Sequence, residues 1–260
     1  MVKMAGESGG VAYAEVPKWA VEKRGDALKE AVAAIRKSKG VDTELVHRLV
    51  VKFEKDPRYK KVRDRALETM KGVDMPYHGG LRHPLEAEVV ALTIAVKEDI
   101  PLEDLVYVGI AAVAHEMGVA EGCKGHEERS VRNAYKWMDE AGYELRDIGL
   151  VGNMILHGTR LPQMPRGKLE EIISDADLAN LGMDSFPESG ELLRLEERAE
   201  NKLEWLKGQQ KFVESHMKRG GYFTDSARKM FGWKERENLE RLKREIAMLE
   251  AVRDPSSGVR

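Results

Sequence analysis

The sequence predicts an all-α fold. Apolar residues recur at three- and four-residue spacing through most of the 260-residue chain, which is typical of helices with one buried face. No run of alternating β-branched residues indicates a strand. Two segments, 105–114 and 148–156, are apolar on nearly every side and should run through the core.

The elements follow in order from the start of the chain. Residues 1–14 are small, polar and rich in glycine, as in a loose terminus. Helical spacing begins at Pro17 and ends at Gly40, and a second helix starts at Asp42 as its cap and is closed by Pro57. Further helices are predicted at about 58–71, 83–98, 102–117, 126–140, 145–157, 167–181, 188–217 and 225–250.

Composition and charge narrow the class of protein. The formal net charge is −2 and the two signs are interleaved, so no basic field favours nucleic acid as a partner. A single cysteine, Cys123, excludes an intrachain disulfide framework and suits a reducing interior. The first ten residues lack an apolar signal segment, and no stretch reaches the length of a membrane span. We therefore expect a cytoplasmic protein with no membrane partner.

The chain should contain three regions. Residues 1–56 form an N-terminal tail and helices that pack on the core, and 57–185 form the helical core. From about 186 to 260, charges alternate with apolar spacing, as in an antiparallel helical extension with a core-facing stripe. A homodimer contact is the alternative role for this extension.

The apolar segment 105–114 delivers ionisable side chains to the interior. It ends in His115 and Glu116, and the other apolar helix ends in His157. Burying such groups without a partner would cost roughly several kcal/mol, and a divalent metal ion compensates imidazoles and carboxylates together. Five of the seven histidines lie between His78 and His157, each near a predicted helix end or just before a helix. The sequence therefore indicates a metal site.

Four motifs in this region resemble those of the HD-domain metal-dependent phosphohydrolases. They are YHGGLRH, AHEMG, GHEERS and DADLANLG, in that order across about residues 76–182. The segment WLKGQQKFVESHMKRGGYFTDSARKMFGWKERENLERL is similar to the helical tail of some predicted members. The resemblance implies an HD-domain helical bundle with a helical C-terminal extension, in which residues 57–185 are the metal-binding core.

The resemblance also implies a ligand set. His83 matches the first metal-binding histidine and His115 the histidine of the His-Asp pair, but Glu116 stands where the family has aspartate. The helical face leaves Asp175 and Asp177 both open, and the resemblance favours Asp177, which follows a small residue. With the additional histidines of dinuclear members, the implied ligands are His83, His115, Glu116, His126, His157 and Asp177.

The implied chemistry is metal-assisted hydrolysis of a phosphoester, by a phosphomonoesterase or phosphodiesterase. The ligand set suits one or two Mn, Fe, Co, Ni or Zn ions better than Mg, and such ions lower the pKa of water from 15.7 towards about 7. Glu116 and His78 are the catalytic residues, with His78 as proton donor, although it precedes His83 by five residues where the pattern has four. Three cations flank the ligands and are expected to hold phosphate: Lys124, Arg160 and Lys168.

The expected substrate is a small phosphorylated metabolite, a nucleotide or related phosphoester. Two other hypotheses stay open. His126 and His157 also suit a di-iron oxygenase on the same scaffold. If Glu116 does not support a reactive water, the site binds a ligand or metal without turnover.

Overall fold

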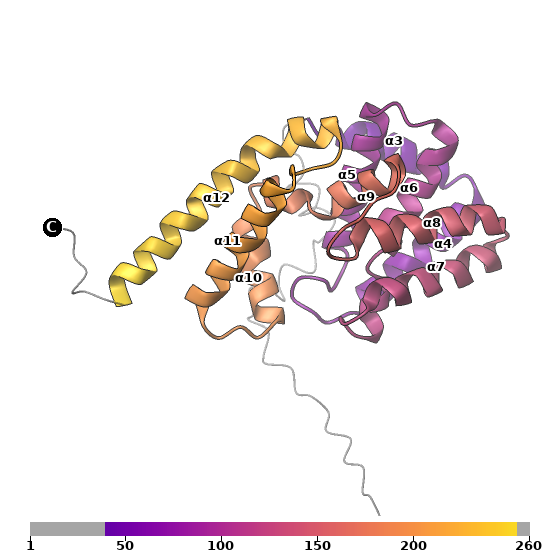
Figure 1. Ribbon diagram of the computed structural model, residues 1–260. Coiled ribbons are helices and arrows are strands. Elements are labelled where there is room, and N and C mark those ends of the chain that lie inside the picture. The colour runs from indigo at the N-terminus through magenta and orange to yellow at the C-terminus, as the bar shows by residue number, and fades with distance from the viewer. Residues whose placement is uncertain (1–39, 254–260) are drawn as a thin grey trace, which may run out of the picture.

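A computed structural model describes residues 40–253, and the helix predicted from Pro17 to Gly40 lies outside them except for its last residue. The described chain is all-helical, which confirms the predicted fold class (Figure 1). Its α-helices are α3 (Thr43–Phe53), α4 (Pro57–Lys71), α5 (Arg82–Lys97), α6 (Leu102–Ala114), α7 (His126–Ala141), α8 (Leu145–Thr159), α9 (Lys168–Asp177), α10 (Phe186–Glu196), α11 (Lys202–Lys218) and α12 (Asp225–Arg253). Two 3-10 helices, η2 (Met117–Glu121) and η3 (Ala179–Gly182), follow α6 and α9.

The first two described helices begin where the sequence indicates. The Asp42 side chain caps α3 by accepting a hydrogen bond from the Leu45 N–H at 2.8 Å. Asp56 caps α4 in the same way, accepting from the Arg58 N–H at 2.9 Å, and Pro57 occupies the first helical position. These local signals therefore locate both helix starts.

The main core is built on α5 and α6. These helices pack on one another, and α4, α8 and α9 pack on α6 while α7 packs against α4 and α8. Every residue of α6 from Val108 to Ala114 is buried, as its continuous apolar sequence predicts. Packing on several sides therefore fixes the positions of α5 and α6, including the helix ends near which histidines lie.

The segment predicted as one helix over 188–217 is two helices, α10 and α11. The chain breaks at Arg198, which has a positive φ of 53°, and the Ala199 N–H donates to the Arg194 carbonyl at 3.0 Å. This is the hydrogen bond of a Schellman motif, with arginine at the position where glycine is usual. Asn201 then caps α11 by accepting from the Glu204 N–H at 3.3 Å. The prediction missed this break because no glycine or proline marks it.

A second, smaller apolar cluster holds the C-terminal helices together. Its buried members come from η3, α10, α11 and the distal part of α12: Leu178, Leu181, Phe186, Leu203, Leu206, Val213, Leu239, Leu242 and Ile246. The first turns of α12 pack instead into the main core through Ala227, Met230 and Phe231. Figure 1 shows α12 running alongside α11 and away from the other helices. α12 therefore contributes to both clusters. The main core thus includes residues beyond 185, where the sequence analysis placed its end.

In the described part of the chain, none of the helices combines the length and the apolar character that a membrane crossing needs.

Candidate metal centre

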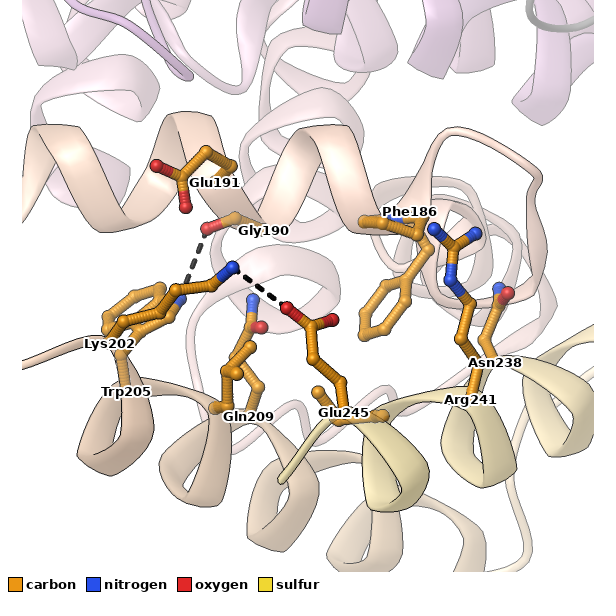
Figure 2. Close-up of a pocket in the computed structure, with 12 residues that line it drawn as sticks. Phe186, Gly190, Glu191, Lys202, Trp205, Gln209, Asn238, Arg241 and Glu245 are labelled. Carbon is orange, nitrogen blue, oxygen red and sulfur yellow. Dashed lines mark hydrogen bonds and ion pairs between the residues drawn. The ribbon is translucent and has the colours of Figure 1, made fainter. Parts of the chain in front are cut away.

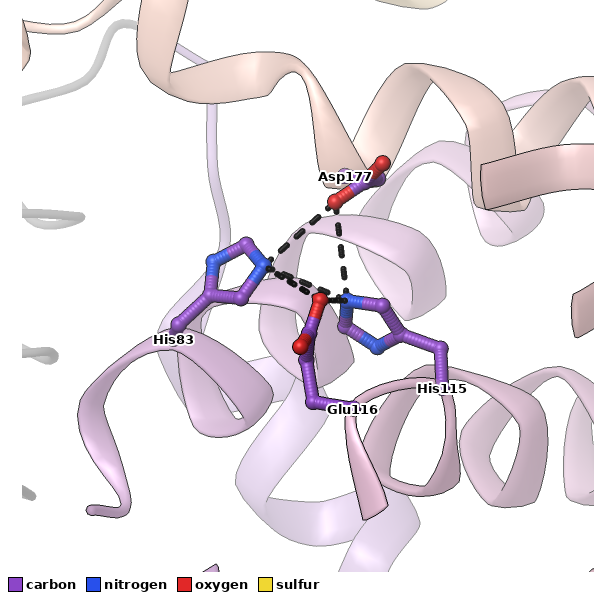
Figure 3. Close-up of side chains that lie close together, drawn as sticks. All are labelled: His83, His115, Glu116 and Asp177. Carbon is purple, nitrogen blue, oxygen red and sulfur yellow. Dashed lines mark hydrogen bonds and ion pairs between the residues drawn. The ribbon is translucent and has the colours of Figure 1, made fainter. Parts of the chain in front are cut away.

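Four ionisable side chains meet where three core helices end or begin. His83 lies in the first turn of α5, His115 and Glu116 directly follow α6, and Asp177 is the last residue of α9. Figure 3 shows the two imidazoles and two carboxylates pointing at one another. One ligand atom from each lies within 4.8 Å of the others. The packing of α5, α6 and α9 therefore brings together residues that are up to 94 positions apart in sequence.

The spacing of these atoms fits a shared cation. His115 Nε2 lies 3.2 Å from His83 Nε2, 3.3 Å from Glu116 Oε1 and 3.5 Å from Asp177 Oδ1. His83 Nε2 lies 3.7 Å from Glu116 Oε1 and 3.4 Å from Asp177 Oδ1. Ligand atoms about 2.1 Å from a metal ion stand roughly 3.0–3.4 Å apart in octahedral or tetrahedral geometry. The observed separations need only small movements to reach that arrangement.

The orientation of His115 prepares its second nitrogen as a ligand. Nδ1 donates a hydrogen bond to the carbonyl oxygen of Ala112 at 2.7 Å, so the neutral ring presents the lone pair of Nε2 to the cluster. One carboxylate oxygen of the neighbouring Glu116, Oε2, is buried and has no hydrogen-bond partner. Glu116 Oε1 faces the imidazoles, and a cation bound by this carboxylate would compensate the cost of burying its unpartnered oxygen.

The charges in the cluster depend on each other. His115 is 1% exposed and Glu116 3%. Burial works against charge on both, but the carboxylates raise the pKa of His115, and the imidazoles lower the pKa of Glu116. Burial also opposes charge on Asp177, yet hydrogen bonds from His115 and His83 lower its pKa to about 2. Both acids are therefore held as carboxylates, the form that binds metal.

His126 stands beside this cluster at the start of α7. Its Nδ1 donates to the carbonyl oxygen of Cys123 at 2.8 Å, and its Nε2 lies 3.7 Å from Glu116 Oε1. Glu116 is thereby placed between His115 on one side and His126 on the other. Burial lowers the pKa of His126, but Glu116 outweighs this effect and raises it to about 9.

His78 is held by a residue that the sequence did not single out. The Nδ1 atom of His78 pairs with Glu196 Oε1, and Glu196 Oε2 accepts from the N–H groups of Tyr77 and His78 at 2.9 and 3.0 Å. Burial opposes charge on His78, but Glu116 and Glu196 raise its pKa to about 9. Glu196 is one acid among many in a charge-rich helix, so no sequence signal distinguishes it.

The loop before α7 is fixed to η2 by close contacts. A Cβ atom at Gly118 would overlap the carbonyl oxygen of His126, and the Gly118 N–H donates to Ser130 Oγ at 2.8 Å. Arg129 Nε donates to the Gly118 carbonyl at 3.0 Å and Nη1 to the Lys124 carbonyl at 2.9 Å. These contacts determine where Glu116 and His126 stand relative to each other.

Four of the expected site residues lie elsewhere in the described structure. His157 Nδ1 faces Glu170 Oε1 at 3.3 Å, and His157 is not part of the four-residue cluster. Arg160 is 60% exposed and pairs with Glu128 at 2.9 Å, while Lys168 pairs with Glu98 and Glu171. Lys124 is exposed. The packing therefore directs these four side chains to other partners or to the surface.

Asp175 has a structural role instead of facing solvent. It is 1% exposed, and its carboxylate accepts from the N–H groups of Phe223 and Thr224 at 2.7 and 2.8 Å and from the Thr224 hydroxyl at 2.7 Å. This anchors the loop between α11 and α12 to α9. Asp177, two positions later, is the aspartate that meets the histidines.

The cluster opens onto a cavity of about 450 Å³. The cluster residues His83, Glu116 and Asp177 line it together with His78 and His126. Apolar side chains from the segment around η3 and from α10 and α11 also line it: Leu178, Leu181, Phe186, Leu193, Trp205, Phe212 and Val213. A volume in the range of roughly 300–1,000 Å³ is usual for a small-molecule site.

Comparison with known proteins gives no further assignment. No family model matches the chain. No curated protein matches it, and no solved structure does. The structure by itself shows an all-helical protein with a buried group, His83, His115, Glu116 and Asp177, that could hold a metal ion.

Proposed function

We propose that this protein is a metal-dependent phosphohydrolase of the HD-domain type that acts on a small phosphoester. The observation that carries the proposal is the buried cluster of two imidazoles and two carboxylates, with an unpartnered carboxylate oxygen, at the edge of a cavity. The ordered motifs that resemble the HD family support it. A buried ionic group beside a pocket of ligand size is a functional site by physical criteria.

His83, His115, Glu116 and Asp177 would hold the metal ion. Bound there, a divalent ion supplies a water of lowered pKa and a positive charge beside the phosphoryl oxygens. The mixed nitrogen and oxygen set favours Mn, Fe, Co, Ni or Zn over Mg. Glu116 lies close to both His115 and His126, at 3.3 and 3.7 Å. The extra methylene that distinguishes glutamate from the family's aspartate therefore extends its carboxylate to a position between two histidines.

His78 is the residue that we assign as proton donor. It lines the cavity, and Glu196 fixes its ring through Nδ1. In hydrolysis, the water oxygen forms a bond to phosphorus, the ester P–O bond breaks, and the leaving alcohol takes up a proton. An imidazolium oriented by a carboxylate is suited to deliver that proton. The second nitrogen of His78 remains available for this role.

The placement of His157 favours hydrolysis over the oxygenase alternative. The oxygenase hypothesis depends on both His126 and His157 joining the ligand set. In the structure His157 faces Glu170 at 3.3 Å, and the cluster forms without it. We therefore prefer hydrolysis.

The test is metal content combined with turnover. Purified protein should contain a transition metal, measured by elemental analysis, and should hydrolyse members of a panel of phosphomonoesters and phosphodiesters. His115→Ala should lose both the metal and the turnover because it removes a central ligand. His47→Ala is the matched control, since His47 is exposed on α3 and should keep both properties.

Two results would contradict the proposal. One is a folded protein that holds metal but hydrolyses no ester with any of the five metals. That result would favour the alternative of a site that binds metal or ligand without turnover. The other is a protein in which His115→Ala leaves both metal content and turnover unchanged.

A further inference from the structure

Apart from the imidazoles beside the cluster, the described lining of the cavity offers no cationic side chain to a highly charged substrate. No lysine or arginine is among the described residues that line it. The lining acids outside the cluster, Glu127 and Glu204, would repel additional phosphate groups. Polyphosphates and other polyanions are normally held by several Arg or Lys side chains. The lining is therefore suited to one anionic group near the metal centre and to little further negative charge.

Two cations near the cavity line a different pocket. A second pocket, of about 220 Å³, lies between α10, α11 and α12 and is lined by Lys202 and Arg241. Figure 2 shows Lys202 paired with Glu245, at 2.8 Å, and Trp205 hydrogen-bonded to the Gly190 carbonyl, at 3.1 Å. Trp205 and Gly190 line both pockets and stand between them. These cations consequently do not line the cavity at the metal centre.

Part of the cavity wall is apolar. Trp205 and Phe212 on α11 and Phe186 and Leu193 on α10 line it. An aromatic and aliphatic wall favours an apolar group because that group leaves water when it binds. Ser189, Asn180 and Gln209 supply only neutral polar atoms. A ligand that contacts this apolar wall as well as His83, Glu116 and Asp177 therefore has one polar part and one apolar part.

A glycine in this wall keeps space open. Glu204, Gly208 and Phe212 are spaced four residues apart on α11, and all three line the cavity. A Cβ atom at Gly208 would meet no atom within 4 Å, so no close packing requires a glycine here. Glycine inside a helix is unfavourable compared with alanine. Gly208 is exposed, and its missing side chain leaves open space at the edge of the cavity.

We propose that the site takes phosphoesters whose non-reacting part is large, apolar and uncharged, such as an aryl or branched alkyl group, and that Gly208 determines the size accepted. This inference rests on the proposed phosphohydrolase activity and narrows its substrate class. The phosphoryl group faces the metal centre, and the apolar group packs against α10 and α11. Nucleoside triphosphates are poor substrates under this proposal, because the described lining offers no lysine or arginine to the phosphate groups that lie away from the metal centre.

The test compares substrates and matched glycine variants of the full chain. The substrates are 1-naphthyl phosphate, glycerol 1-phosphate and ATP, each assayed for kcat/KM. Wild-type protein should prefer 1-naphthyl phosphate over the other two by at least about tenfold. Gly208→Phe should lower kcat/KM for 1-naphthyl phosphate by about 10- to 100-fold and affect glycerol 1-phosphate much less.

Two control variants separate loss of space from loss of fold. Gly208→Ala adds only one methyl group and should keep the preference. Gly232→Phe places the same large residue on α12, where a Cβ atom also meets nothing within 4 Å and which does not line the cavity. It should leave both substrates unaffected. Equal losses for Gly208→Phe and Gly232→Phe would overturn the role of Gly208.

Binding of uncharged 1-naphthol, measured by calorimetry, distinguishes this inference from the activity on which it rests. If no ester is hydrolysed but Gly208→Phe weakens 1-naphthol binding at least about tenfold, the apolar site stands and the phosphohydrolase proposal fails. If the protein hydrolyses glycerol 1-phosphate or ATP better than 1-naphthyl phosphate, the phosphohydrolase proposal stands and the substrate class is wrong.

Discussion

At the scale of single residues, Asp175 and Asp177 show how two acids that lie two positions apart on one helix acquire different roles. Asp177 is the last residue of α9, and its Oδ1 lies 3.4 and 3.5 Å from the two imidazoles of the cluster. Asp175 points to the other flank and accepts three hydrogen bonds from Phe223 and Thr224. Asp177 therefore belongs to the metal centre and Asp175 to the attachment of the C-terminal helices.

Asparagine substitution separates these two roles. Asp177→Asn should abolish metal binding because it removes a charged ligand. Asp175→Asn should retain the metal but lower the free energy of unfolding by about 1–3 kcal/mol, because it weakens buried hydrogen bonds to a charged acceptor. Elemental analysis and urea unfolding measure the two effects. Loss of metal in Asp175→Asn with retention in Asp177→Asn would reverse the assignment.

Cys123 provides a second test at the residue scale, as the chain has no other cysteine. Burial and the charge of Glu196 raise the pKa of this thiol to about 11, from a usual value of 9.0. A raised pKa keeps the thiol protonated below pH 11, so at pH 8 its thiolate should be about 100-fold scarcer than for an ordinary cysteine. Cys123 is an exposed residue, although its sulfur lies 3.9 Å from Met75 Sδ and 4.0 Å from Glu196 Oε1.

Alkylation by iodoacetamide, followed by mass spectrometry, measures this effect. The rate should keep rising between pH 8 and about 11, since only the thiolate reacts. Glu196→Gln should speed the reaction at pH 8 because it removes a negative charge near the sulfur. A rate that reaches its plateau near pH 9 would contradict the proposed electrostatic environment of Cys123.

At the scale of secondary-structure elements, the metal centre depends on where helices end. The sequence predicted a helix over 102–117, but α6 ends at Ala114 and η2 begins at Met117. His115 and Glu116 thus lie in the turn between them, where their side chains are free to face the ends of α5 and α9. Gly118 in η2 packs so closely on α7 that a Cβ atom would overlap the His126 carbonyl. η2 can pack this closely, and Glu116 can take its observed position, only because residue 118 has no side chain.

Gly118→Ala should therefore weaken both the fold and the metal site. Overpacking of this kind costs about 1–3 kcal/mol, and the shift of η2 away from α7 should also lower metal affinity. Gly72→Ala is the matched control, because a Cβ atom there would meet only the Thr69 carbonyl at an ordinary 3.6 Å. Urea unfolding and metal titration test both variants. Equal stability and metal affinity in the two variants would refute the argument.

At the scale of the whole molecule, the C-terminal helices form both a second cluster and a wall of the cavity. α11 contributes Leu203, Leu206 and Val213 to that cluster, and it presents Trp205 and Phe212 to the cavity. α12 joins the clusters, because its first turns pack into the main core. The extension thus forms part of the cavity wall beside the candidate metal centre.

The two clusters should differ in local stability. The cluster around α11 and the distal half of α12 buries fewer apolar side chains than the core around α5 and α6. Amide hydrogens of α11 should therefore exchange through openings of lower free energy than those of α5 and α6. Native-state hydrogen exchange in increasing urea measures this difference. Equal opening free energies would show instead that the two clusters unfold as one unit.

The sequence by itself determined the fold class and the general chemistry of the site. Helical spacing predicted most helices, and the end of an almost wholly apolar segment predicted that His115 and Glu116 are buried. Both features are local, because amphipathic periodicity and burial can be inferred from neighbouring residues. Motif order added His83 and Asp177, and the structure shows that these four side chains converge.

Only the tertiary structure decided which of the remaining residues meet. It placed His157 against Glu170, Arg160 against Glu128, and Asp175 beneath the loop before α12. It also introduced Glu196 and the apolar wall, which no motif marks. The physical reason is that periodicity indicates which face of a helix is buried, whereas crossing angles and loop paths decide which helix ends converge.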